Sequence, residues 1–154
     1  MDDRSITIRL DPADLLLPGL ALISAVFLVV ASFGPWASMI GVTAVSGMDD
    51  NGALILPLAI IAGVGAIAHI LRPDTRIWLA GIMLAAFGLA AFVAAIDWTT
   101  IADTGYAPLR DASVGWGVQL AAVSATIGAL ISFVALMEWA LAPDGADERV
   151  DARA

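Results

Sequence analysis

Four long apolar runs limit what this chain can fold into more than any other feature of its sequence. They span residues 15–34, 53–71, 77–96 and 114–141, and they contain almost no charged side chains. At 1.5 Å per residue, a helix over each run can cross a hydrocarbon layer of about 30 Å. Inside lipid every backbone N–H and C=O must be paired within the protein, and the alternating pattern of a transmembrane barrel is absent. We therefore predict an all-α membrane protein, a four-transmembrane-helix up-down bundle.

The runs divide the chain of 154 residues into three parts. These are an N-terminal segment (1–14), a membrane domain (15–141) and an acidic tail (142–154). The first run is longer than the apolar region of a typical signal peptide and no small-x-small cleavage site follows it, so we expect an uncleaved anchor. Only 14% of the residues are charged, against roughly 25% in soluble domains.

The arginines predict the orientation. They flank the runs on one side, with a single exception in the loop 97–113; the first group is Arg4, Arg9, Arg72, Arg76, Arg149 and Arg153, and the exception is Arg110. By the positive-inside rule both termini are expected to be cytoplasmic. All seven basic residues are arginine, which is typical of a GC-rich bacterial genome. The expected location is a bacterial plasma membrane.

All five tryptophans fall where an apolar run begins or ends. An indole has an apolar body and one N–H that needs a partner, so it favours headgroup depth. We therefore predict that the tryptophans are interfacial anchors and that Gly34 and Pro35 end the first helix. The anchors are Trp36, Trp78, Trp98, Trp116 and Trp139.

Small residues recur every three or four positions in the later runs and predict a helix-packing face. Such stripes let helix backbones approach closely in lipid. The third run carries Gly81, Ala85 and Gly88, and the fourth carries Ala121, Ala125, Gly128 and Ser132. An alternative interpretation is that one of these stripes faces another protein instead of a neighbouring helix.

Two loops, 36–52 and 97–113, form the expected extracytoplasmic cap. The first is rich in β-branched residues and closed by glycine, which predicts a short strand or β-hairpin, and the second could fold against it. Asp49, Asp50 and Asn51 precede the second run, and their side chains are expected to cap its helix. A calcium site would need Asp103 or Asp111 as well, and the spacing matches no known calcium loop.

Two ionisable side chains lie near the expected cytoplasmic ends of the runs. They are His69 and Glu138, and the middle of every run lacks Asp, Glu, Lys and Arg. The two side chains either form a polar pair, which would make a pH-sensitive latch, or each snorkels to the headgroups; we favour snorkelling. The uncharged middle of the runs argues against an ion-coupled transporter.

The inventory of reactive residues excludes most membrane enzymes. The chain has one histidine and no cysteine, so paired haem ligands, thiol chemistry and clustered zinc ligands are all lacking. It has no glycine-rich phosphate loop and no basic patch for nucleic acid. We predict that it is not an enzyme and has no catalytic, cofactor or metal site.

The layout of four spans with a strand-like first loop resembles that of claudins and other tetraspan proteins, although the claudin cysteine pair is absent. Three short motifs, Pro35-Trp36, Ser46-Gly47 and Asp50-Asn51-Gly52, resemble those of small, uncharacterised four-span membrane proteins of actinobacteria. The resemblance implies a plasma-membrane location.

Two functions are compatible with these features. The first is an accessory or scaffold subunit of a larger respiratory or cell-envelope complex, whose partners are membrane lipids and other integral membrane subunits. The second is a small homo-oligomeric channel or a carrier for a neutral or lipidic solute. Its polar path would use hydroxyls along the helices, namely Ser24, Ser32, Ser124, Thr126 and Ser132.

Overall fold

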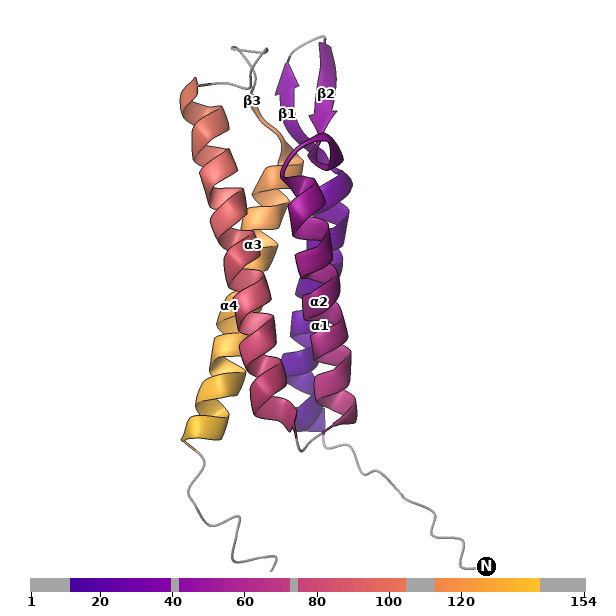
Figure 1. Cartoon of the computed structure of the whole chain (residues 1–154), viewed down its shortest axis with the longest axis vertical. Coiled ribbons are helices and arrows are strands. Elements are labelled where there is room, and N and C mark those ends of the chain that lie inside the picture. The colour runs from indigo at the N-terminus through magenta and orange to yellow at the C-terminus, as the bar shows by residue number, and fades with distance from the viewer. Residues whose placement is uncertain (1–11, 40–41, 73–74, 105–112, 142–154) are drawn as a thin grey trace, which may run out of the picture.

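The structure, a computed structural model, describes residues 12–39, 42–72, 75–104 and 113–141. Four antiparallel helices run along its long axis: α1 (Pro12–Phe33), α2 (Gly52–Leu71), α3 (Arg76–Thr104) and α4 (Trp116–Ala140) (Figure 1). Each is long and apolar enough to cross a membrane. The predicted all-α, four-helix membrane fold is confirmed. The segments 1–11 and 142–154, with Arg4, Arg9, Arg149 and Arg153, lie outside the described residues, as do Arg110 and Asp111.

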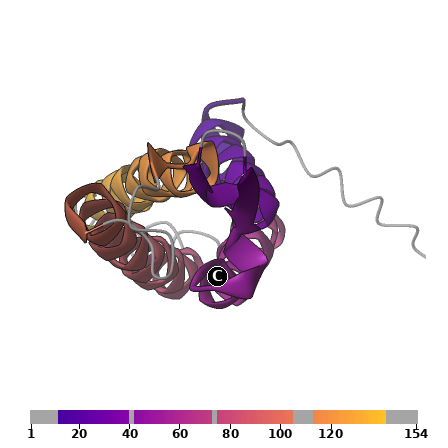
Figure 2. The same cartoon turned by 90° about the horizontal axis from the view of Figure 1, so that it is seen from above.

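The helices form a closed ring in chain order (Figure 2). Helix α1 contacts α2 and α4, and α3 contacts the same two neighbours. The ends of the bundle differ: strands cover one end, here called the sheet end, and the α2–α3 connection lies at the other, here called the turn end (Figure 1). Because the helices alternate in direction, α1 begins and α4 ends at the turn end.

Alanine dominates the faces that meet inside the ring. Small side chains permit the close backbone approach on which helix association in lipid depends. Larger side chains fill holes left by glycine: a Cβ on Gly128 would lie 2.5 Å from the Phe87 ring, and one on Gly65 would lie 2.9 Å from Met83 Cγ. The buried alanines of the helices are Ala21, Ala25, Ala31, Ala59, Ala62, Ala66, Ala80, Ala86, Ala90, Ala94, Ala121 and Ala125.

A three-stranded antiparallel sheet closes the sheet end. Its order is β2 (Val42–Ser46), β1 (Pro35–Met39), β3 (Ser113–Val114), with Pro35 opposite Ser46 and Ala37 opposite Val114. A 3₁₀ turn, η1 (Gly47–Asp49), joins the sheet to α2. The predicted hairpin in the first loop is confirmed, and the second loop contributes β3.

Helix α3 is longer than the run 77–96 predicted, because it continues to Thr104. Burial of one side chain and hydrogen bonds from another stabilise the additional residues at its end. Ile101 is buried, and the Thr99 hydroxyl donates to the Ala95 and Ile96 carbonyl oxygens at 3.1 and 2.9 Å. A polar sequence after Ile96 thus ends the apolar run without ending the helix.

The contact between Phe87 and Gly128 gives a test of the packing. We expect Gly128→Ala to lower the free energy of unfolding by about 1–3 kcal/mol, because the new methyl group overpacks a buried ring. Gly88→Ala is the matched control, since nothing lies within 4 Å of a Cβ at that position. It should be neutral or stabilising by up to about 1 kcal/mol through helix propensity. Unfolding by SDS titration in mixed micelles measures both, and equal effects would contradict the packing described.

Candidate functional site

Four of the five tryptophans point outward near helix ends, whereas Trp36 does not. Trp78 is 75% exposed, and Trp98, Trp116 and Trp139 are also exposed. Trp36 is 0% exposed, and its Nε1 donates to the Ala31 carbonyl oxygen at 3.2 Å. The prediction that Trp36 is an interfacial anchor is wrong. The same carbonyl oxygen accepts from the Gly34 N–H at 3.1 Å, and because Pro35 has no N–H to donate, the indole supplies its second hydrogen bond inside the protein.

Glycines from two distant segments surround the Trp36 indole. A Cβ on Gly47 would overlap Nε1, and one on Gly117 would lie 2.9 Å from Cδ1. The Gly115 N–H donates to the Trp36 carbonyl oxygen at 2.7 Å, and Gly47 N–H donates to Gly34 at 2.9 Å. Trp36 thereby joins α1, η1 and the start of α4 at one point. The sequence alone does not reveal this burial, because the closeness of Gly47 and Gly117 to Trp36 depends on the fold.

A polar contact links α2 and α3 below the sheet. Asn51 Nδ2 donates to Asp97 Oδ1 at 2.8 Å, and Asp97 is 9% exposed. The sequence singled out Asn51 only as part of the segment before α2, and it gave no role to Asp97. Of the three residues expected to cap α2, Asn51 occupies the N-cap position, but no side chain makes a capping bond there. Among the described residues no group of three or more potential metal ligands comes together.

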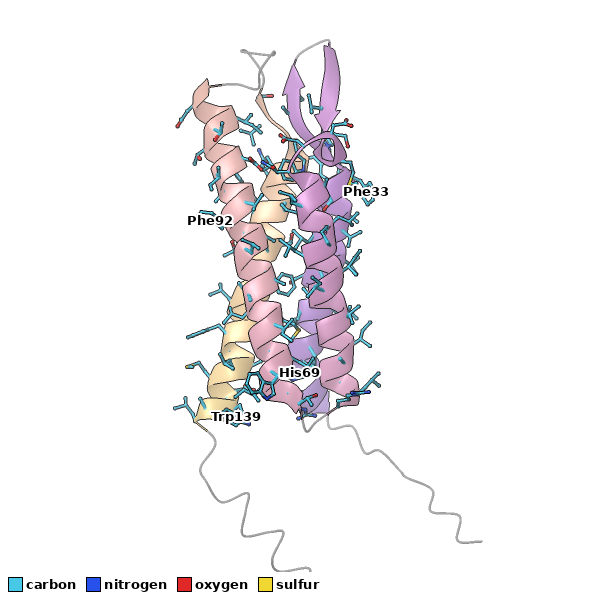
Figure 3. The ribbon with its side chains drawn as sticks, in the orientation of Figure 1. Phe33, His69, Phe92 and Trp139 are labelled. Carbon is cyan, nitrogen blue, oxygen red and sulfur yellow. The ribbon has the colours of Figure 1, made fainter. Side chains whose placement is uncertain are left out.

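A pocket of about 230 Å³ opens at the turn end between all four helices. Its polar lining comes from His69 on α2, Arg76 on α3 and Glu138 on α4. Figure 3 shows His69 and Trp139 at this end. The rest of the lining is Leu17, Pro18, Ala135 and Trp139. His69 is 8% exposed, so the preferred prediction that it snorkels to the headgroups is wrong. It continues the buried face of α2, seven residues after Ala62. The pocket brings the predicted pair together and adds Arg76, which sequence analysis used only as a topology signal.

The predicted packing face is confirmed on α4 and wrong on α3. Ala121, Ala125, Gly128 and Ser132 are buried in the bundle. On α3, Ala85 and Gly88 are exposed, and nothing lies within 4 Å of a Cβ placed on Gly81 or Gly88. Helix α3 packs inward through a different series, which is Ala80, Met83, Phe87, Ala90 and Ala94.

The outward stripe is here called the α3 outer face. It consists of Gly81, Ala85, Gly88 and Phe92, which follow one another at intervals of four, three and four residues. Phe92 is 63% exposed and points away from the bundle (Figure 3). In an alanine-rich helix both series have helical spacing. The series that contains Met83 and Phe87 faces inward because these two side chains fill the spaces left by Gly65 on α2 and Gly128 on α4.

The hydroxyls proposed to line a solute path all bond within their own helices. Each donates to the carbonyl oxygen four residues earlier, at 2.6–3.0 Å, a common arrangement for Ser and Thr in helices. They are Ser24, Ser32, Ser124, Thr126 and Ser132. Thr126 is also exposed on the outside of the bundle. These five side chains form no continuous polar lining.

Comparison of the chain with family models, with curated proteins and with solved structures gives no match.

The burial of Trp36 gives a second test. We expect Trp36→Phe to lower the free energy of unfolding by about 2–3 kcal/mol, because it removes a buried hydrogen bond and leaves a cavity. Trp139→Phe, at an exposed indole, should change it by less than about 0.5 kcal/mol. SDS titration followed by circular dichroism measures both variants. A Trp36 variant as mild as the Trp139 variant would mean that the indole is not a buried junction.

Proposed function

We propose that this chain is an accessory subunit of a larger integral membrane complex and that the α3 outer face binds a transmembrane helix of a different protein. The observation that carries the proposal is the open space at Gly81 and Gly88, where nothing lies within 4 Å of a Cβ. A backbone from outside the bundle can approach α3 closely at both positions. In lipid such close approach is a main source of helix association.

The free-energy cost of glycine inside a helix supports a partner at the α3 outer face. Glycine inside a helix is roughly 1 kcal/mol less favourable than alanine. Gly65 and Gly128 offset that cost by receiving Met83 and Phe87 from α3. Gly81 and Gly88 receive no side chain from the described part of the bundle. A partner helix that places a side chain in these holes would make the same kind of contact that already holds the bundle together.

The chemistry of the helices favours a subunit over a channel or carrier. The five hydroxyls of the suggested solute path donate to their own helix carbonyls. The middle of each helix has no charged residue that could mark a transport pathway. As part of the proposal, the termini and the α2–α3 connection face the cytoplasm of a bacterial cell, as the arginine distribution favours.

Filling the two holes tests the proposal. In the double variant Gly81→Leu/Gly88→Leu we expect retention of the partner protein to fall about ten-fold or more, which corresponds to 1.4 kcal/mol or more of binding free energy. The full chain is extracted from its own membrane in a mild detergent, and the mass of the released assembly is measured. The wild-type assembly should contain a second, different protein.

Gly19→Leu is the matched control, because Gly19 on α1 also has nothing within 4 Å of a Cβ. It makes the same change of residue on another helix and should retain the partner. Three results would contradict the proposal: release of the wild type as a solitary monomer, an assembly made only of copies of this chain, or full retention of the partner by the double variant.

A further inference from the structure

A groove separate from the α3 outer face lies between α2 and α3 at the turn end. Its volume is about 480 Å³, and its walls include Val64, Ile67 and Leu71 from α2 and Trp78 and Leu79 from α3, with Arg72 at its rim. Val64, Ile67, Leu71 and Trp78 are all exposed large side chains, so the groove is open to whatever surrounds the bundle. It contains no residue of the α3 outer face.

Polarity changes along this groove in one direction. Arg72 is the C-cap residue of α2 and its side chain is exposed, and Trp78 stands near it in the first turn of α3. From Arg72 the lining runs through Leu71 and Ile67 to Val64, eight residues deeper along α2. At 1.5 Å per residue this is about 12 Å. The groove thus has a cationic, aromatic rim and an apolar floor.

That order of chemistry matches one molecule of phospholipid lying along the helices. A phosphate at the rim would meet the guanidinium, which binds phosphate through a planar fork of donors. The upper part of an acyl chain would lie over Ile67 and Val64, and the indole of Trp78 suits the depth of the headgroup. Of the lining residues that the structure describes on either side of positions 73–74, none is acidic. Basic grooves between transmembrane helices are recognised sites for anionic headgroups.

We infer that the α2–α3 groove is a binding site for an anionic phospholipid, with Arg72 contacting the phosphate and Trp78 the headgroup region. The site does not depend on the proposed function, because it uses different residues. The lipid would cover the apolar floor that the ring of helices leaves exposed at this end. Its headgroup charge gives selectivity, whereas its acyl chains give affinity that any phospholipid shares.

The test uses the full purified chain, stripped of lipid in a mild detergent and titrated with phosphatidylglycerol or phosphatidylcholine of identical acyl chains. Mass measurement of the intact complexes gives the bound fraction of each. We expect the wild type to bind phosphatidylglycerol about five-fold more tightly, the factor expected for one arginine near an anionic headgroup. Arg72→Gln should reduce that preference to about one while leaving phosphatidylcholine binding unchanged.

Two further variants separate the site from general electrostatics and from loss of fold. Arg149→Gln removes the same charge from the tail and should retain the five-fold preference. Arg72→Lys keeps the charge and should retain most of it. The inference is overturned if the wild type binds both lipids equally, if Arg149→Gln lowers the preference as much as Arg72→Gln, or if a second copy of the chain occupies the groove and excludes lipid.

Discussion

Close approach of small residues holds this protein together, and every other feature of the fold depends on it. A hydrocarbon solvent does not drive apolar side chains into a core, so helices must gain from tight packing instead. The bundle accordingly places alanine inside and large side chains outside: Phe27, Phe92 and Leu130 are among the exposed ones. This distribution is the reverse of that in a soluble domain. The few large buried residues, such as Phe87 and Met83, occupy holes that glycine provides.

The sheet end uses the same principle with a larger side chain. Trp36 fits among Gly47, Gly115 and Gly117, and its N–H satisfies a carbonyl at the end of α1. Because β1 begins beside this indole and β3 immediately precedes Gly115, the position of the sheet is fixed to the helices at one junction. The Asn51–Asp97 hydrogen bond links the start of α2 to α3. The sheet is therefore held to the helices by the same kind of close packing that holds the helices together.

The sequence predicted the helices and the hairpin because these depend on local signals: the length of each apolar run and the β-branched residues after Trp36. It was harder to predict which face of each helix points into the bundle. On α4 the predicted series, which is Ala121, Ala125, Gly128 and Ser132, is the one that faces the bundle. On α3 two series compete, and the choice between them depends on Gly65 and Gly128, which belong to other helices.

The sequence also did not predict which single polar side chains are buried. Trp36 could satisfy its N–H at a lipid headgroup or at a backbone carbonyl, and only the fold brings Gly47 and Gly117 next to it. The same holds for His69, which lies at a helix end but on the buried face. Arg76 joins it in the pocket at the turn end because α3 begins there. For each of these residues the local sequence allows either exposure at a helix end or burial inside the protein. Only the packing of the other helices decides between the two.

The central claim, that a different protein covers the outside of α3, can be tested most directly by photocrosslinking in the living membrane. A photoreactive phenylalanine analogue replaces Phe92 on the α3 outer face or, as a control, Phe33 at the end of α1; the two side chains are 63% and 58% exposed and lie on different helices (Figure 3). The account predicts a discrete adduct with a second protein from position 92 and lipid adducts from position 33. Lipid adducts alone from both positions, or an adduct with another copy of this chain, would contradict it.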